Sequence, residues 1–215
     1  EKLGALFALK KIKHQYPHCW RCHKPIIFRA TSQWFCSVDD FKDAAVKAAE
    51  DVKWYPEWGK DRLQSMVVER ADWCISRQRK WGVPIPVVYC KECGKEIIDD
   101  GIMQKVSDIF GEEGSDAWFA HDAEYFLPEG FECPHCHKAN GFEKETDIMD
   151  VWFDSGSSHA AVLKNRNYLK WPADVYLEGA DQYRGWFQSS LLTSVAAGNR
   201  APYEPVSYTH LTLPT

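Results

Sequence analysis

The sequence lacks long hydrophobic runs, an excess of basic residues, internal repeats and low-complexity segments. No apolar stretch approaches the roughly 20 residues that a membrane-spanning helix needs, and no signal-peptide pattern is present. We therefore expect a cytoplasmic protein without a membrane partner. The 26 Lys and Arg against 31 Asp and Glu give a net charge of -5, which argues against a general nucleic-acid-binding surface but leaves room for a local basic patch.

What the sequence does contain is typical of a globular protein. Of its 215 residues, 45% are hydrophobic and 27% are charged, which suits one large domain or one and a half. Ten tryptophans favour large buried contacts and pockets.

Eight cysteines are present, and six of them form three C-x-x-C pairs. Without a signal peptide, this arrangement favours metal binding over disulfides and indicates a reducing compartment. Two of the pairs lie roughly forty residues apart, a spacing that is typical of one closed, structural zinc site. The predicted ligands are Cys90, Cys93, Cys133 and Cys136. His135 and His137 are alternative ligands that such a site does not need.

The first pair, Cys19 and Cys22, has no second pair near it. Its partners are nearby histidines, residues further along the chain, or residues outside this sequence, and two buried thiols are the alternative. The nearby histidines are His14, His18 and His23. Cys36 and Cys74 are interpreted as core residues.

Hydrophobic spacing predicts the elements along the chain. One helix has the core face Phe41, Ala45, Ala48 and Val52, and a second spans 62–69. An extended run over 84–89 leads into the second cysteine pair. Residues 96–131 are acidic and carry several aromatic side chains, which predicts a small subdomain attached to the metal site. Alternation over 149–154 predicts a strand that ends in a Ser-Gly turn.

Three serines, Ser155, Ser157 and Ser158, follow that predicted strand and could line a site. No G-x-S-x-G run is present, and His159 lies too close in the sequence to complete a hydrolase triad with them. A nucleophilic serine is therefore not predicted.

The stretch 72–82 places Arg77, Arg79 and Lys80 beside Trp73 and Trp81. Cations next to aromatic rings bind phosphates or nucleic acid. They also form ordinary packed surfaces, in which the aliphatic stems cover apolar groups. The motif alone leaves both interpretations open.

The stretch 174–187 joins a strand to a helix. Residues 175–177 are an apolar run of strand type, and helical spacing runs from Gln182 to about Gly198. The connection carries Glu178, Gly179, Asp181 and Gln182. Because ligands bind beyond the carboxyl ends of strands in open α/β sheets, the two carboxylates are candidate ligands for an ammonium group or ribose hydroxyls. They are equally well explained as helix caps.

Three runs occur in a fixed order. They are Trp73-Cys-Ile-Ser-Arg-Gln-Arg79 with Trp81-Gly82, Asp150-Val-Trp-Phe-Asp-Ser-Gly156, and Leu177-Glu-Gly-Ala-Asp-Gln-Tyr-Arg-Gly-Trp-Phe187. Together they resemble the isoleucyl-tRNA synthetases, which are class I aminoacyl-tRNA synthetases. The resemblance extends from about Tyr16 to Tyr203, and the third run is not shared by the valyl and leucyl relatives.

The resemblance implies an α/β fold, namely the second half of a class I Rossmann catalytic domain with an inserted zinc-binding connective subdomain. It implies an internal fragment that begins after the family's editing domain, because neither the HIGH motif nor the KMSKS loop occurs here. The implied parts are a connection (1–36), catalytic helices and a strand (37–89), the zinc-binding subdomain (90–146) and the second half of the nucleotide fold (147–205). Residues 206–215 do not continue the family pattern and are expected to be a non-native tail outside the fold.

The resemblance also implies roles for particular residues, none of them catalytic. The contacts to isoleucyl-adenylate would be Glu178, Gly179, Asp181 and Gln182. Trp152 and Trp186 would wall the isoleucine side-chain pocket, with plain core packing as the alternative for both. Cys19 and Cys22 would be one half of a second zinc site.

The implied parent function is activation of L-isoleucine with ATP and Mg²⁺, followed by transfer to tRNA(Ile). We expect a monomer, and we expect this fragment to be inactive alone. The alternative is a non-catalytic zinc-ribbon module that binds nucleic acid or protein through Arg77, Arg79 and the knuckles. The net charge of -5 argues against that alternative.

Overall fold

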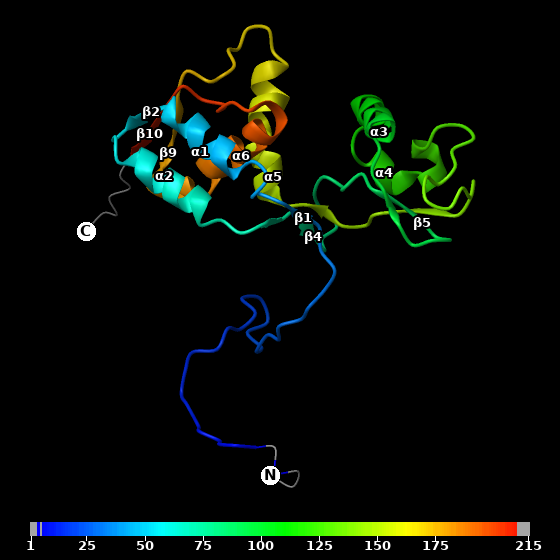
Figure 1. Cartoon of the computed structure of the whole chain (residues 1–215), viewed down its shortest axis with the longest axis horizontal. Coiled ribbons are helices and arrows are strands. Elements are labelled where there is room, and N and C mark those ends of the chain that lie inside the picture. Colours follow the sequence, from blue (N-terminus) through cyan, green and yellow to red (C-terminus); the bar gives the residue numbers. More distant parts are fainter. Residues whose placement is uncertain (1–3, 5, 210–215) are drawn as a thin grey trace. The chain divides into compact units, whose positions relative to one another are not determined.

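The computed structural model describes residues 4 and 6–209, which divide into two units, Glu1–Ser32 and Gln33–Thr215 (Figure 1). In the first unit, a bridge between His18 and Pro25 closes a turn that carries Cys19 and Cys22. All the helices and strands named below lie in the second unit. No helix among the described residues is both long and apolar enough to cross a bilayer.

The strands of the second unit are short. They are β1 (Phe35–Cys36), β2 (Lys53–Tyr55), β3 (Trp73–Cys74), β4 (Ser76–Arg77), β5 (Val88–Cys90), β6 (Glu96–Ile97), β7 (Phe142–Lys144), β8 (Ile148–Met149), β9 (Tyr176–Gly179) and β10 (Pro205–Thr209). The α-helices are α1 (Lys42–Glu50), α2 (Gly59–Val68), α3 (Asp100–Glu113), α4 (Ala117–Ala120), α5 (Val151–Gly156) and α6 (Trp186–Gly198). Shorter helical turns are η1 (Ala123–Phe126), the π-helical η2 (His159–Lys164) and η3 (Ala180–Tyr183).

A parallel sheet in the order β2-β10-β9 forms the centre of the α/β core, which also contains α1, α2 and α6. Val206 in the middle strand pairs with Trp54 on one side and Tyr176 on the other, and it is fully buried. Parallel strands need such cover because both faces of the sheet are apolar. The predicted α/β class is confirmed by this sheet and its helices.

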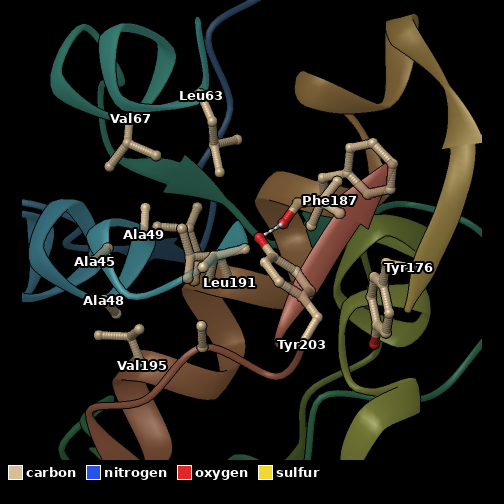
Figure 2. Close-up of a cluster of buried hydrophobic side chains, with 14 of the residues drawn as sticks. Ala45, Ala48, Ala49, Leu63, Val67, Tyr176, Phe187, Leu191, Val195 and Tyr203 are labelled. Carbon is tan, nitrogen blue, oxygen red and sulfur yellow. Dashed lines mark hydrogen bonds between the residues drawn. The ribbon is translucent and has the colours of Figure 1, made fainter. Parts of the chain in front are cut away.

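The helices cover the sheet with the apolar faces that their spacing predicts. Figure 2 shows side chains of α1, α2 and α6 meeting in one cluster. Those labelled from these helices are Ala45, Ala48, Ala49, Leu63, Val67, Phe187, Leu191 and Val195. The Tyr203 hydroxyl donates a hydrogen bond of 3.0 Å to the Phe187 carbonyl, so the buried ring has a polar partner. This packing fixes where β9 ends and α6 begins.

The expectation that residues 206–215 lie outside the fold is wrong for 206–209. These residues belong to β10, the middle strand of the parallel sheet. The sequence Val-Ser-Tyr-Thr carries no charge and is rich in β-branched and aromatic residues, which suits a strand with neighbours on both sides. Residues 210–215 lie outside the described residues, and a non-native origin of the tail stays a prediction.

The strand predicted over 149–154 is also wrong in most of its length. Strand β8 stops at Met149, and α5 begins at Val151. Val151 and Trp152 are both exposed, at 67% and 43%, whereas Phe153 packs against the core. Six alternating residues are too few to separate a strand from a short helix, and here packing against α6 decides in favour of the helix.

The four-cysteine subdomain, residues 88–144, has a core of its own. An antiparallel sheet in the order β6-β5-β7 packs with α3 and the turns that follow it. Its largest buried side chains are Trp118 and Phe126, and the buried thiols of Cys90 and Cys133 belong to the same cluster. The side chain of Asp99 caps α3 by accepting a 3.1 Å hydrogen bond from the Ile102 backbone N–H. The inter-knuckle segment therefore forms a compact structure, as its composition predicts.

Candidate functional site

The candidate ligand residues follow the carboxyl end of β9. Strand β9 runs parallel to β10, so Glu178 and Gly179 lie at the edge where a parallel sheet presents its carboxyl ends. The chain then passes through η3 and reaches α6 at Trp186. The sequence therefore predicted the connection correctly, with a short helical turn inserted before the main helix.

The side chain that caps α6 is an amide, not a carboxylate. Gln182 Oε1 accepts a 2.7 Å hydrogen bond from the backbone N–H of Trp186, the first residue of α6. Glu178 accepts from the backbone N–H of Gly179 at 3.2 Å, and Asp181 accepts from the Gln182 side chain at 3.0 Å. Both carboxylates are exposed. Neither carboxylate therefore caps α6, although Asp181 lies in the first turn of η3.

Trp186 is half-buried, and three contacts hold its ring. The indole N–H donates to the Ser155 carbonyl at 3.0 Å and lies 3.2 Å from the Ser158 hydroxyl. Its ring stacks on Tyr176, with centroids 4.0 Å apart and planes 9° apart. An indole that is bonded at its edge and stacked on one face has a fixed orientation, which suits the wall of a pocket.

A cavity of about 270 Å³ lies beside Trp186. Its lining residues are Ser158, His159, Val162, Leu163, Ala173, Val175, Tyr176 and Trp186. The lining is mostly apolar, which suits a branched aliphatic group. Glu178, Asp181 and Trp152 do not line this cavity, so the structure does not bring all the predicted site residues to one cavity.

Trp152 lies near the start of α6. A Cβ atom at Gly185 would clash with Gln182 Oε1 and would stand 3.0 Å from the Trp152 ring atom Cη2. A larger residue at 185 would therefore have to displace the capping amide or this ring. Trp152 is 43% exposed and belongs to neither buried core, so plain core packing does not explain it. The structure brings Trp152, Gln182 and Trp186 to the start of one helix.

His159 lines the same cavity, and the sequence reasoning missed it because His159 was considered only as part of a triad. The imidazole is 2% exposed and lines the cavity beside Trp186. Burial, with a smaller contribution from the charge of Lys164, lowers the pKa of His159 to about 4. Its Nε2 lies 3.3 Å from the Thr193 hydroxyl, while Nδ1 is buried without a described partner. His159 is therefore a neutral group at the cavity wall near neutral pH.

Asp150 is buried and connects the run that begins at Asp150 to the run that begins at Trp73. It accepts a 2.9 Å hydrogen bond from the Trp73 indole and forms a 3.1 Å ion pair with Arg77. Arg79 and Trp81 are exposed. Arg77 therefore neutralises a buried carboxylate, and the basic stretch is at least partly a structural element.

The four predicted metal ligands converge. The sulfur atoms of Cys90, Cys93, Cys133 and Cys136 all lie within 4.8 Å of one another. The Cys90–Cys136 and Cys93–Cys133 pairs are 3.6 and 3.8 Å apart. Tetrahedral zinc with Zn–S bonds of about 2.3 Å requires sulfur separations of about 3.8 Å. The donor set and its spacing fit zinc.

Electrostatics in the four-cysteine cluster also fit a cation. Burial raises the pKa of the Cys133 thiol, but the backbone N–H groups of His135 and Cys136 more than offset this and lower it to about 6. At Cys136 the backbone N–H of Lys138 lowers the pKa, yet burial and the neighbouring sulfurs raise it to about 12. Four thiolates this close repel one another, and a divalent cation removes that repulsion.

The turn at Cys19 repeats the geometry of the turns at Cys90 and Cys133 in the four-cysteine cluster. In each knuckle the first cysteine donates its N–H to the carbonyl five residues later, and its own carbonyl accepts from the N–H four residues later. These bonds are 2.9 and 2.7 Å at Cys19, 3.0 and 2.7 Å at Cys90, and 2.9 and 2.8 Å at Cys133. The fifth residue has a positive φ each time, at His23, Gly94 and His137. Within the described residues, no third Cys, His, Asp or Glu joins Cys19 and Cys22.

Comparison with known proteins gives consistent similarities. The family model for tRNA synthetases class I (I, L, M and V) matches residues 9–214. The isoleucine–tRNA ligase of Caldicellulosiruptor bescii is 64% identical over 206 residues, which are 96% of this chain and 22% of the relative. The enzyme of Caldicellulosiruptor saccharolyticus is 64% identical over 201 residues, which are 94% of this chain and 22% of the relative. The enzyme of Carboxydothermus hydrogenoformans is 62% identical over 209 residues, which are 96% of this chain and 22% of the relative. The chain thus spans about a fifth of the length of these curated relatives.

Proposed function

This chain belongs to the class I tRNA synthetases (I, L, M and V), and from that premise we propose that it is part of an isoleucine–tRNA ligase. The whole enzyme would activate L-isoleucine with ATP and Mg²⁺ to isoleucyl-adenylate and then transfer the amino acid to tRNA(Ile). Identities of 62–64% to curated isoleucine–tRNA ligases along nearly the whole chain support this proposal.

The adenylate would lie against the connection between β9 and α6. Glu178 and Asp181 would hold the α-ammonium group and the ribose hydroxyls, with Gly179 and Gln182 forming the floor between them. The observation that carries this assignment is that both carboxylates are exposed, Glu178 at the carboxyl end of β9 and Asp181 in η3 directly after it, while Gln182 provides the cap of α6. Catalysis by such a site rests on positioning and on charge stabilisation.

The isoleucine side chain would lie against Trp186 and Trp152. The apolar cavity beside Trp186 and the fixed orientation of its ring support Trp186 more directly than Trp152. A pocket of this kind reads a branched side chain by shape, and it rejects a ligand one methylene smaller by only about 1–3 kcal/mol. Discrimination against valine would therefore need a further editing step outside this chain.

Zinc would have a structural role. In the four-cysteine subdomain it would cross-link the two knuckles, and a site with four protein ligands has no open position for catalysis. Cys19 and Cys22 would form half of a second zinc site, which the matching knuckle geometry supports. A monomeric state and a cytoplasmic location stay predictions of the sequence. The alternative of a nucleic-acid-binding ribbon is less well supported, because Arg77 is paired with Asp150.

The adenylate site is tested by substituting Asp181→Asn in the full-length protein and measuring isoleucine-dependent ATP–pyrophosphate exchange. Loss of a charge-assisted bond of about 1.5–3 kcal/mol should lower kcat/KM by about 10- to 100-fold. Asp174→Asn is the matched control, because Asp174 is also exposed but pairs with Lys170 instead. Equal exchange rates in the two variants would contradict the assignment. The 215-residue chain alone should give no exchange.

A further inference from the structure

A second cavity lies between α2 and α6, separate from the one beside Trp186. Its volume is about 210 Å³, and its lining residues are Met66, Glu69, Arg70, Arg184 and Gln188. Two arginines in one small cavity repel each other unless an anion lies between them. The charges around this cavity therefore decide what it would bind.

Arg70 is half-buried and incompletely neutralised. Its Nη1 donates a 2.6 Å hydrogen bond to Gln188 Oε1, and its guanidinium lies 5.1 Å from the centroid of the Trp73 ring. No described carboxylate forms an ion pair with it, since the nearby Asp150 pairs with Arg77. Its Nε is buried without a described partner, and burial lowers the pKa of the Arg70 guanidinium. A buried charge in this state is costly unless a counter-charge joins it.

Arg184 and Gln188 add donors to the same cavity. Arg184 is exposed and directly follows η3, and it forms no ion pair among the described residues. Gln188 is 2% exposed, and its carbonyl oxygen already accepts from Arg70, so its amide N–H groups remain for another acceptor. Glu69 is the one carboxylate in the lining. It is exposed, and among the described residues it forms no ion pair with either arginine. The lining therefore carries two positive charges and one negative charge.

We propose that the Arg70–Arg184 cavity binds a phosphate group. A guanidinium presents a planar fork of N–H donors that matches the oxygens of phosphate in a bidentate manner. Two such groups and one amide can serve the several charged oxygens of a phosphate, whereas a carboxylate offers two. The phosphate would come from a small phosphate compound or from an RNA backbone, and the chemistry of recognition is the same. This proposal does not rest on the proposed synthetase function.

The primary test uses the 215-residue chain with inorganic phosphate as the probe. Phosphate binding is measured by ³¹P NMR line broadening at constant ionic strength, with circular dichroism to check folding. Arg184→Gln should raise the Kd for phosphate by about 10-fold or more, because it removes charge-assisted hydrogen bonds worth about 1.5–3 kcal/mol. Arg166→Gln is the matched control, since Arg166 is also exposed and bonds only Tyr168. Its Kd should equal that of the unmodified chain.

A second probe identifies the source of the phosphate. A short fluorescent single-stranded RNA is titrated by anisotropy, with and without inorganic phosphate. RNA binding that Arg184→Gln weakens and free phosphate competes away supports the proposal with an RNA backbone as the source. Phosphate binding that depends on Arg184 without any effect on RNA supports it with a small phosphate compound.

The proposal is overturned if the unmodified chain, Arg184→Gln and Arg166→Gln bind phosphate and RNA equally, or if none binds phosphate. Arg184→Glu serves as a second variant at the same exposed position. It places a carboxylate at the cavity mouth, so phosphate binding should be lost, and unchanged binding there would also overturn the proposal.

Discussion

The α/β core and the four-cysteine subdomain are stabilised in different ways within one chain. The α/β core closes around apolar side chains of α1, α2, α6 and the parallel sheet, several of which Figure 2 shows. The four-cysteine subdomain has strands of two or three residues, and its small core includes Cys90 and Cys133 themselves. A small core gains stability from a structural metal where apolar burial is insufficient. The comparison teaches that packing holds the first region and that a metal is expected to hold the second.

The largest effect is expected from removing one metal ligand. Cys93→Ser removes one of the four proposed ligands and should abolish zinc binding. The subdomain should then unfold, because structural zinc contributes on the order of 10 kcal/mol to the folding of small domains. The zinc content measured by elemental analysis should fall from about one zinc per chain to well below one. Hydrogen exchange should become fast over residues 88–144 and stay slow in α1 and α6.

Cys36→Ser is the control for that experiment, since Cys36 is half-buried but does not belong to the four-cysteine group. Retained zinc in Cys93→Ser would disprove the metal site. If α6 lost protection from hydrogen exchange to the same extent as α3, the two regions would not be stabilised independently.

A smaller loss of folding stability is expected in the α/β core when the pH is lowered. The pKa of His159 is lowered to about 4 in the folded chain, against an ordinary value of 6.5. Below pH 6.5 the unfolded chain therefore takes up the proton first, and stability falls as the pH decreases toward 4. Between pH 7 and pH 5 the loss should be about 2 kcal/mol.

Urea denaturation of the unmodified chain and of His159→Gln at both pH values measures this contribution. The His159→Gln variant should lack the loss of stability that protonation of His159 causes. Acid release of the metal lowers the stability of both proteins equally. The same pH dependence in the two proteins would show that His159 does not titrate in this way.

The smallest effect separates the cap from the candidate ligands. Gln182→Ala removes the hydrogen bond to the Trp186 N–H and should cost about 1 kcal/mol of stability. Asp181→Ala removes only a contact to the Gln182 side chain on the surface and should change stability by no more than about 0.5 kcal/mol. Chemical denaturation of both variants gives the two values. A larger cost for Asp181→Ala would mean that the carboxylate is structural.

The four-cysteine cluster and the connection between β9 and α6 could be predicted from the sequence because their signals are local. Two C-x-x-C pairs specify their own turns, and an apolar run followed by helical spacing specifies a strand and a helix. The three ordered runs also predicted the family correctly. The domain boundaries drawn from the resemblance, at 36, 89 and 146, stay predictions.

Errors arose where distant contacts overruled a weak local pattern. Residues 206–209 carried no helical period or turn signal, so their place between β2 and β9 could not be read without the sheet. The alternation over 149–154 suited a strand, yet contacts with α6 made most of it a helix. Short segments are weak predictors because a few kcal/mol of tertiary packing exceed their intrinsic preferences.

The sequence by itself indicated that Cys90, Cys93, Cys133 and Cys136 come together, and it also determined the α/β class and the position of the two carboxylates after a buried strand. Only the tertiary structure decided that Gln182 provides the cap, that His159 is buried beside Trp186, and that Arg70 and Arg184 share a cavity. Spacing along the chain fixes turns and faces, because these depend on neighbours in sequence. Burial, partners and pKa depend on which remote groups fold against a side chain, and those are set by the whole structure.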